Sequence, residues 1–389
     1  MTVMKADFLA EAEAAANEIS ALREAIHRRP ELGNRERETA ALVENTLRGY
    51  GIETYRPLDT AVVGVLRGGR PGAAVALRAE LDALPVAEAT GAAFASACPG
   101  VMHACGHDVH MAAALGAARL LSRRRAELAG TVRFFFQPDE EGRGGARRMI
   151  DAGCMGDTEA VFGCHVDPAL PLGVVGIRYG KFYAASDCFS VTLRGRGAHG
   201  AQRDKGIDAL AAAAELVTAL LRLPEALRLE RAVLTVGTLR AGTAENIIPG
   251  LAELSGMFRT LGTDNRETLR EALRQTVEAV SAAHGTQAEL ELRPSYSGVV
   301  NTEAETALAQ RAAEALLGPE RVVLLREPLM TTEDFGCFVD AAAGSFYHIG
   351  AGCASPLHAP DFLPAPRAAV LAAALHAAVL WDYLNHTRE

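Results

Sequence analysis

Metal-binding side chains are concentrated in residues 103–110, which read HACGHDVH. Three histidines, one cysteine and one aspartate fall within these eight residues. Thiolate and imidazole are strong ligands for borderline divalent metals. Cys105 and His107 flank a glycine, so a loop can direct both side chains to one point, and Asp108 can cap the helix expected after it. The alternative is a cysteine and histidines that the protein core satisfies by chance.

Two adjacent carboxylates, Glu140 and Glu141, belong to the motif QPDEEG at residues 137–142, directly after an apolar segment that predicts a strand. Carboxylates at the end of a strand are costly unless they are solvated, paired or bound to a metal. One of the pair can ligate a metal, while its neighbour acts as general base toward metal-bound water. The alternative is a solvated acidic turn.

Asp82, His165 and His358 each follow a further expected strand. In open α/β sheets the ligand crevice lies outside the carboxyl ends of the strands. Each residue is weak evidence by itself, because a lone histidine is more often an ordinary surface or core residue. Five separate loops that carry metal-type residues to one rim of a sheet together predict a metal site there.

The elements expected around these residues are those of an α/β domain with a mostly parallel sheet. Strands alternate with helices up to about Tyr183. From there the expected order is strand, helix, strand, strand, helix, strand, which is the split βαβ arrangement of ferredoxin-like domains. After Pro294 the α/β pattern returns. We therefore expect a catalytic domain made of residues 1–182 and 296–389, with residues 183–295 inserted as a second domain.

Composition limits the classes of function. The chain has 389 residues, a net charge of −9 and a pI of about 5.7, which argues against the basic surface that non-specific nucleic-acid binding requires. Its seven cysteines are scattered and form no CxxC pair, which favours a reducing compartment over a disulfide framework. The N-terminal segment carries acidic residues too early for a signal peptide, and no uncharged stretch of 18 apolar residues occurs. We expect a cytoplasmic protein with no nucleic-acid partner and no membrane span.

Five motifs together resemble those of the M20 metallopeptidases, in the subgroup of aminoacylases, hippurate hydrolases and auxin-conjugate (IAA-amino acid) hydrolases. The resemblance covers about residues 26–379. It implies a catalytic α/β domain with a dimetal centre and an inserted lid domain that commonly dimerises. The motifs are RAELDALP at 78–85, HACGHDVH at 103–110, QPDEEG at 137–142, GTAENIIP at 242–249 and EDF at 333–335.

The resemblance implies five ligands for two divalent metal ions per subunit, which could be zinc, manganese, cobalt or nickel. Cys105 would lie between the two ions. His107 and His165 would complete one site, and Glu141 and His358 would complete the other.

The resemblance also implies roles for five further residues. Glu140 would be the general base, and Asp82 would orient a ligand imidazole. In the inserted domain, His199 would reach a neighbouring subunit's active site and stabilise the oxyanion. Asn246 and Arg259 would hold the substrate's carboxylate, which an arginine fork fits well. The alternatives are an ordinary exposed turn histidine for His199 and a solvated charge at a strand end for Arg259.

Three departures from the family pattern stand out. Gln202-Arg203-Asp204 stands where Met-Pro-His is common, Glu245 stands where an apolar residue is common, and Asp139 stands where alanine is usual. The first departure bears on the pocket or the dimer contacts, whereas the catalytic set is intact.

The sequence therefore predicts a metal-dependent amidohydrolase that cleaves N-acyl-L-amino acids to a carboxylate and a free amino acid with metal-activated water. It is expected to form a homodimer through the inserted domain. Three alternatives stay open: a dipeptidase or carboxypeptidase with the same centre, an aromatic amine hydrolase, and a metal-free binding protein on the same fold. A free α-amine on a dipeptide would need an acidic partner, for which Glu245 is the one unusual carboxylate near the motif.

Overall fold

The computed structural model describes residues 2–386. The chain forms two compact units. Unit 1 comprises residues 1–180, 300–327 and 334–389, and unit 2 comprises residues 181–299 and 328–333. Unit 2 is thus inserted into the chain of unit 1. The chain passes from unit 1 to unit 2 in β7 (Gly180–Tyr183) and back in β14 (Val299–Asn301), and residues 328–333 return to unit 2.

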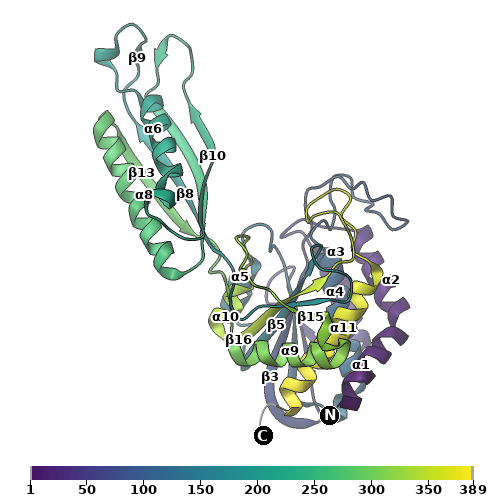
Figure 1. Cartoon of the computed structure of the whole chain (residues 1–389). Helices are drawn as coiled ribbons and strands as arrows, with labels where there is room; N and C mark the ends of the chain where they lie inside the picture. The colour runs from purple at the N-terminus through teal and green to yellow at the C-terminus, as the bar shows by residue number, and fades with distance from the viewer. Residues whose placement is uncertain (1, 387–389) are drawn as a thin grey trace. The chain divides into compact units, whose positions relative to one another are not determined.

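Unit 1 is built on an eight-stranded sheet within the described residues (Figure 1). The four inner strands β4, β3, β5 and β16 run parallel to one another, whereas β2 pairs antiparallel with β1 and β4, and β6 pairs antiparallel with β16. The inner strands are buried on both faces, as apolar parallel strands covered by helices usually are. Across the sheet the order is β1 (Glu53–Tyr55), β2 (Val62–Arg67), β4 (Ala129–Gln137), β3 (Arg70–Glu80), β5 (Thr158–Asp167), β16 (Ala343–Gly350), β6 (Val175–Ile177) and β15 (Val322–Leu324).

Helices cover both faces of this sheet (Figure 1). The larger layer is centred on the contact between α4 and α11, and its members are α1 (Thr2–Ala14), α2 (Ala16–Arg28), α3 (Arg37–Gly49), α4 (His107–Arg123), α9 (Glu303–Leu317) and α11 (Pro366–His386). The opposite face carries the two short helices α5 (Gly145–Asp151) and α10 (Gly336–Ala341), which contact each other.

Helix α11 is the one helix within residues 2–386 that is long and apolar enough to cross a membrane. Of its most apolar stretch, 83% is buried inside the structure. It packs against α1, α4 and the sheet, so its apolar character is explained by its place in the core of unit 1.

The carboxyl ends of the four inner strands meet at one edge of the sheet. Glu80 at the end of β3 is in register with Gln137 at the end of β4. Gly350 at the end of β16 is in register with Asp167 at the end of β5. Every segment that follows one of these strands therefore begins at the same rim, which is where ligands bind in open α/β sheets.

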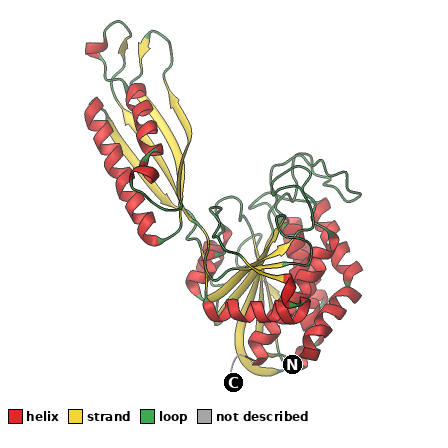
Figure 2. Cartoon of the chain, in the orientation of Figure 1, coloured by secondary structure: helices red, strands yellow, loops and turns green. Residues whose placement is uncertain are grey.

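Unit 2 contains an antiparallel four-stranded sheet with two helices on one face (Figure 2). The strand order β10-β12-β8-β13 and the chain order βαββαβ are those of the split βαβ fold, as the sequence predicted. Phe189, Leu254, Phe258, Leu216 and Leu273 form much of its core. The elements are β8 (Ala185–Arg194), α6 (Ala209–Leu221), α7 (Leu223–Ala226), β10 (Ala232–Ala241), β12 (Leu251–Thr260), α8 (Thr263–His284) and β13 (Gln287–Pro294), with the small pair β9 (Ala198–His199) and β11 (Ile247–Ile248).

Candidate metal centre

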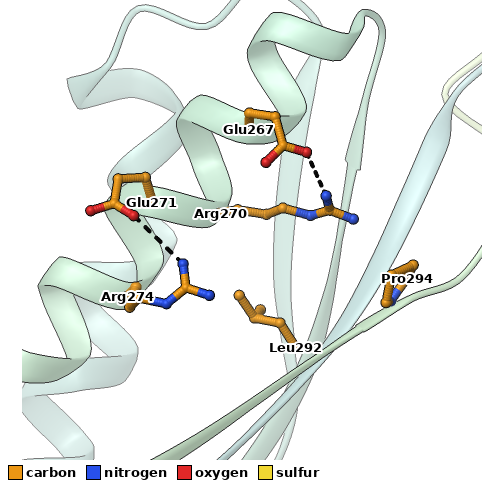
Figure 3. A pocket seen from close by; sticks show the side chains of 6 residues that line it. All are labelled: Glu267, Arg270, Glu271, Arg274, Leu292 and Pro294. Atoms are coloured by element: carbon orange, nitrogen blue, oxygen red, sulfur yellow. Dashed lines mark hydrogen bonds and ion pairs between the residues drawn. The ribbon is translucent and has the colours of Figure 1, made fainter.

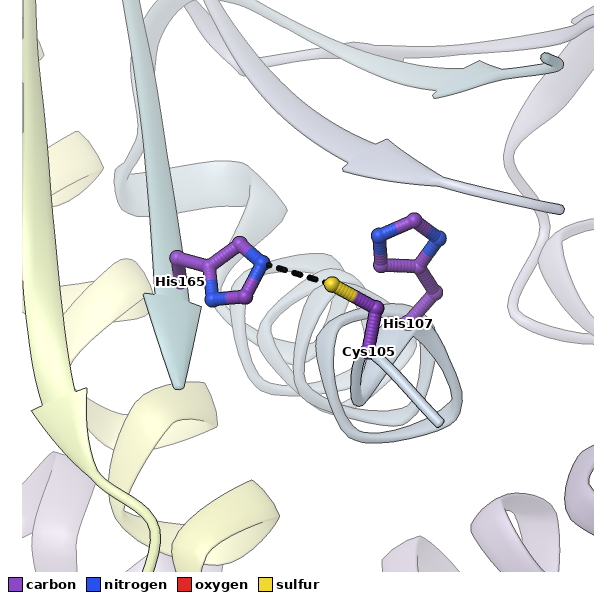
Figure 4. A group of neighbouring side chains, drawn as sticks. All are labelled: Cys105, His107 and His165. Atoms are coloured by element: carbon purple, nitrogen blue, oxygen red, sulfur yellow. Dashed lines mark hydrogen bonds between the residues drawn. The ribbon is translucent and has the colours of Figure 1, made fainter. Parts of the chain in front are cut away.

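The thiol of Cys105 lies between two imidazoles. Its Sγ atom is 3.4 Å from Nε2 of His165 and 3.3 Å from Nε2 of His358. Potential ligand atoms of Cys105, His107 and His165 all lie within 4.8 Å of one another, and the same holds for Cys105, Glu141 and His358. Two groups of three potential ligands therefore share one thiol, and Figure 4 shows the first of them.

A glycine places Cys105 and His107 on either side of a sharp turn. Gly106 has a φ of 84°, in the left-handed region that glycine adopts without strain. A Cβ atom on Gly106 would also lie only 2.4 Å from Cγ2 of Val166. The turn leads directly into α4, which begins at His107.

Asp82 lies directly after β3 and connects two other members of the cluster. Its backbone oxygen accepts a hydrogen bond of 2.8 Å from Nδ1 of His107. Its carboxylate Oδ2 accepts one of 2.9 Å from the backbone N–H of Glu141. Asp82 thus fixes the ring of His107 and the start of the Glu141 segment together.

His165 lies inside β5, near its carboxyl end. Nδ1 of His165 donates to the backbone oxygen of Val166 over 2.7 Å, which leaves Nε2 facing the thiol. Burial, aided by the neighbouring His110, lowers the pKa of His165 to about 3. The ring is therefore neutral at ordinary pH, which is the form that binds metals.

The loop after β4 carries Glu140 and Glu141. Glu140 is 7% exposed, and its carboxylate lies within 4.8 Å of the potential ligand atoms of His107 and Glu141. Oε1 of Glu141 is 3.1 Å from Nε2 of His358. Burial raises the pKa of Glu141, but the hydrogen bond to His358 and nearby imidazole charges lower it to about 2 overall.

His358 comes from the segment between β16 and α11. Its backbone has a φ of 67°, which is uncommon for a residue other than glycine. Its N–H donates to the backbone oxygen of Ala104 over 2.8 Å, so the two ligand-bearing loops are tied together directly. The half-exposed ring is the most open member of the cluster.

The charge and the tautomers of the cluster fit a bound cation. Nε2 of His107 is buried and has no hydrogen-bond partner among the described residues. Since Nδ1 donates to Asp82, the neutral ring keeps a lone pair on Nε2. Burial lowers the pKa of His107, but the charge of Glu80 and the hydrogen bond to Asp82 raise it to about 10 overall, so the pocket favours positive charge.

The thiol also needs a cation to ionise. Burial, followed by the charges of Glu141 and Glu140, raises the pKa of Cys105 well above its ordinary value. Coordination to a metal ion deprotonates a thiol and reverses this effect. The mixed set of sulfur, nitrogen and oxygen ligands suits zinc and its first-row neighbours.

Asp108 does not cap α4, contrary to the expectation from the sequence. The helix begins one residue earlier, and no side chain caps its N-terminus. Oδ2 of Asp108 instead accepts hydrogen bonds of 2.9 Å from Nε of Arg23 and from Nδ1 of His27. A buried guanidinium competes for the carboxylate more strongly than a backbone N–H, and it ties α2 to the start of α4.

A buried chain of polar side chains behind the cluster was not predicted from the sequence. Nδ1 of His110 contacts Oε2 of Glu80 at 2.8 Å, and Nε2 of His110 accepts a bond of 3.0 Å from the N–H of Val166. Arg78 pairs with Glu80 and, at 2.7 Å, with Asp334. The signal was present in the sequence, because charged residues at 78 and 80 inside an apolar strand need buried partners.

The predicted residues of unit 2 lie in two separate places, the small β9–β11 pair and strand β12. His199 in β9 and Asn246 beside β11 are exposed neighbours, since Ile247 pairs with His199 and the Asn246 backbone oxygen accepts from Gly200. Arg259 lies near the other end of β12. It lies eight residue steps along the strand from Leu251, which is about 26 Å at about 3.3 Å per step.

Arg259 is the more buried of these residues. Its Nε atom is buried and has no hydrogen-bond partner within the described part of the chain. Its strand neighbours are Val233 on β10 and Ser186 on β8. The structure therefore groups His199 with Asn246 but does not bring Arg259 to them.

Unit 2 also has a pocket of about 280 Å³ between α8 and β13 (Figure 3). Its charged residues pair with each other along α8, Arg270 with Glu267 and Arg274 with Glu271. No potential nucleophile or metal ligand other than these paired carboxylates lines it. The lining residues are Glu267, Arg270, Glu271, Arg274, Leu292 and Pro294.

A model of the peptidase family M20/M25/M40 matches residues 76–381, a range that contains the whole cluster around Cys105. The chain belongs to this family. The resemblance inferred from the five motifs is therefore confirmed.

Named relatives in this family cover nearly the whole chain. N-acetylcysteine deacetylase of Bacillus subtilis (strain 168) is 37% identical over 345 residues, which are 88% of this chain and 90% of that protein. Thermostable carboxypeptidase 2 of Saccharolobus solfataricus is 35% identical over 376 residues, which are 94% of this chain and 95% of that protein.

A solved structure of the family has the same fold. A dinuclear metal binding peptidase of the M20 family from Bacillus subtilis is 34% identical and superposes with a TM-score of 0.85. The match covers 96% of this chain and 99% of that one. A protein of this fold and family thus binds two metals.

Proposed function

We propose that the protein is a metal-dependent amidohydrolase that cleaves N-acyl-L-amino acids to a carboxylate and a free amino acid. The observation that carries this proposal is the pair of three-ligand groups that share the Cys105 thiol, with the Glu140 carboxylate beside them. The N-acetylcysteine deacetylase relative supports the substrate class.

Five residues would hold two divalent ions per subunit. Cys105 would bridge them, His107 and His165 would complete one site, and Glu141 and His358 would complete the other. Zinc, manganese, cobalt and nickel all suit this ligand set. When bound, such ions lower the pKa of water and polarise a carbonyl group.

The protein's own residues would move the proton. Glu140 would take a proton from the attacking water and return it to the nitrogen of the leaving amino acid. Glu140 lies beside His107 and Glu141, but it belongs to neither of the two three-residue groups that contain Cys105. Asp82 would keep Nδ1 of His107 protonated, so that Nε2 stays available to a metal.

Unit 2 would act as the lid and the dimerisation domain. His199 would stabilise the oxyanion, and Asn246 and Arg259 would bind the substrate's carboxylate. One small substrate cannot span the distance of about 26 Å along β12 from Arg259 to Leu251, the end of the strand that follows Asn246 and β11. A site that uses all three therefore draws them from two chains, which favours a homodimer in which His199 acts on its partner's substrate.

Two relatives with different printed names share one chemical feature. An N-acylated amino acid and the C-terminal end of a peptide both present an amide nitrogen next to a free carboxylate. The carboxypeptidase relative therefore favours a second candidate, a carboxypeptidase or dipeptidase with the same metal centre. The two candidates differ in what lies on the acyl side of the bond.

A hydrolysis screen on protein reconstituted with each metal tests the proposal. N-acetyl and N-benzoyl amino acids should be cleaved at least ten times faster than dipeptides, judged by kcat/KM. Preferred cleavage of dipeptides would favour the second candidate, and preferred cleavage of an N-aryl amide would favour an aromatic amine hydrolase. Protein that takes up no metal and cleaves none of these would be a binding protein on the same fold.

The cysteines support a place in the cytoplasm. All seven are free thiols, and four of them, including Cys105, are buried. A reducing compartment keeps a bridging thiol available for metal, whereas an oxidising one exposes it to disulfide formation.

A further inference from the structure

Asp139, directly before the two glutamates of the candidate site, has an unusual backbone. Its φ is 58°, in the left-handed region that few residues other than glycine, asparagine and aspartate adopt. This turn sets the direction in which the chain leaves β4 and enters the segment of Glu140 and Glu141. Asp139 itself is 4% exposed.

The carboxylate of Asp139 is held from two sides. Oδ2 accepts a hydrogen bond of 2.6 Å from Nδ2 of Asn34 and one of 3.3 Å from the N–H of Arg143. Nη1 of Arg148 is 3.5 Å from the same oxygen, and Arg148 also donates to Asn34. Asn34 is left-handed as well, with a φ of 63°. Two left-handed residues from distant segments are thus joined side chain to side chain.

Gly33 and Gly142 leave the space that the carboxylate of Asp139 occupies. A Cβ atom on Gly33 would lie 2.2 Å from Oδ1 of Asp139, and a Cβ atom on Gly142 would also lie 2.2 Å from it. Neither glycine has a positive φ, so the backbone alone does not require glycine at these positions. The carboxylate of Asp139 is what excludes a larger residue.

The backbone of Asp139 is fixed too. Its N–H donates over 2.9 Å to Oε1 of Glu36, a fully buried residue at the start of α3. Its carbonyl oxygen accepts over 3.0 Å from Gly144, just before α5. The backbone N–H, the carbonyl oxygen and the carboxylate of Asp139 therefore all have hydrogen-bond partners.

We propose that Asp139 is a positioning residue whose carboxylate, locked between Gly33 and Gly142 by Asn34 and Arg148, holds the loop that directs Glu140 and Glu141. This inference rests on the proposed function, because it concerns the alignment of the general base and of one metal ligand. A misplacement of about 1 Å in such a group can cost about 100-fold in rate. The carboxylate acts through the loop and does not touch the reacting atoms.

The test compares Asp139→Ala with Asp139→Asn in the full-length protein loaded with metal. Alanine is usual at this position in the family, but in this chain the space beside Gly33 and Gly142 is occupied by the carboxylate. In Asp139→Ala we therefore expect kcat to fall about 100-fold while KM stays within about threefold, since the base acts in the transition state. Metal content should fall from two ions toward one per chain, because Glu141 is misdirected. Asp139→Asn accepts the same bond from Asn34 and tolerates the left-handed backbone, so it should keep two ions and most of kcat. Asp151→Ala, at the exposed end of α5, is the matched control and should behave like the unmodified protein.

A double-mutant cycle with Gly33→Ala gives a second, independent measurement. The added methyl group displaces the carboxylate, so Gly33→Ala alone should reproduce much of the loss in kcat and metal content. In the Asp139→Ala background the same substitution should cost less than about twofold, because neighbouring residues that act together are not additive. If Asp139→Ala does not fold, Asn34→Ala removes one donor and should lower kcat and metal content in the same direction.

Two results would overturn the proposal. One is an Asp139→Ala protein that keeps kcat and two ions and only melts at a lower temperature, which would give the carboxylate a purely structural role. The other is a double mutant in which the losses of kcat caused by Gly33→Ala and Asp139→Ala simply add up. If the unmodified protein binds two ions but cleaves no N-acyl amino acid, the proposed function fails, and the metal content of these variants still decides the role of Asp139.

Discussion

In unit 1, residues from separate segments meet around one thiol, whereas in unit 2 the candidate residues stay apart. Sγ of Cys105 is 3.3 Å from the imidazole of His358, in the segment after β16, and 3.4 Å from that of His165, near the carboxyl end of β5. In unit 2, His199 and Asn246 are exposed at the small β9–β11 pair, and Arg259 lies about 26 Å along β12 from Leu251.

This difference follows from how the candidate residues of each unit are held in position. The cluster in unit 1 is largely buried, so its polar atoms need fixed partners such as the Asp82 backbone and carboxylate. The exposed residues of unit 2 are solvated and need no such partners. A metal centre can therefore be organised within one chain, whereas we propose that the residues of unit 2 form a site only with a substrate and a second chain.

The largest expected effect is that of removing the proposed general base from unit 1. Glu140→Gln should lower kcat by about 10²- to 10⁴-fold and leave two metal ions bound, because the amide keeps the shape but cannot accept the proton. Steady-state kinetics with elemental analysis of the same sample measures both. Turnover close to that of the unmodified enzyme would remove Glu140 from the mechanism.

The next effect tests whether unit 2 acts across a dimer. His199→Ala should lower kcat by about 10²- to 10³-fold, which is typical for the loss of one oxyanion donor. Mixing inactive Glu140→Gln and inactive His199→Ala chains should then restore about one intact site per mixed dimer. If subunit exchange is confirmed but no activity is recovered, then His199 acts in its own chain.

A smaller effect is expected at the other end of the unit 2 sheet. Arg259→Lys keeps the charge but loses the planar fork, so KM should rise about tenfold with little change in kcat. An amide analogue of the substrate, which lacks the carboxylate, should show no such difference between Arg259→Lys and the unmodified enzyme. An equal rise in KM for both substrates would mean that Arg259 does not bind the carboxylate.

The smallest effect concerns pH and belongs to unit 1. The hydrogen bond that His358 donates to the Glu141 carboxylate raises the pKa of His358 above its ordinary value. Below that pKa the protonated ring competes with metal, so apparent affinity should fall by up to about tenfold for each pH unit and recover as pH rises. Metal titrations at several pH values, in the unmodified protein and in His358→Ala, isolate this contribution from those of Cys105 and His107. The same slope in both proteins would exclude His358 as a ligand.

The sequence was a good guide to the rim of unit 1 for a physical reason. Cys105 comes after β3, Glu141 after β4 and His358 after β16. These strands belong to the parallel part of the sheet, and their carboxyl ends meet at one edge. The βαββαβ order of unit 2 was also predictable, because its helices and strands alternate with clear periods.

The parts that the sequence did not reveal depend on distant partners. Asp108 has the sequence context of a helix cap, but Arg23 and His27, more than 80 residues earlier, take its carboxylate. The left-handed turn at Asp139 depends likewise on Asn34 and Glu36. The short strands β6 and β15 have three residues each, too few to show a period.

The central claim is that one thiol serves two metal positions, and metal content tests it most directly. Elemental analysis should find two divalent ions per chain in the unmodified protein, about one in His165→Ala and in His358→Ala, and almost none in Cys105→Ala. Circular dichroism of each variant would confirm that it is folded. A folded Cys105→Ala protein that still binds two ions as tightly as the unmodified protein would contradict the account.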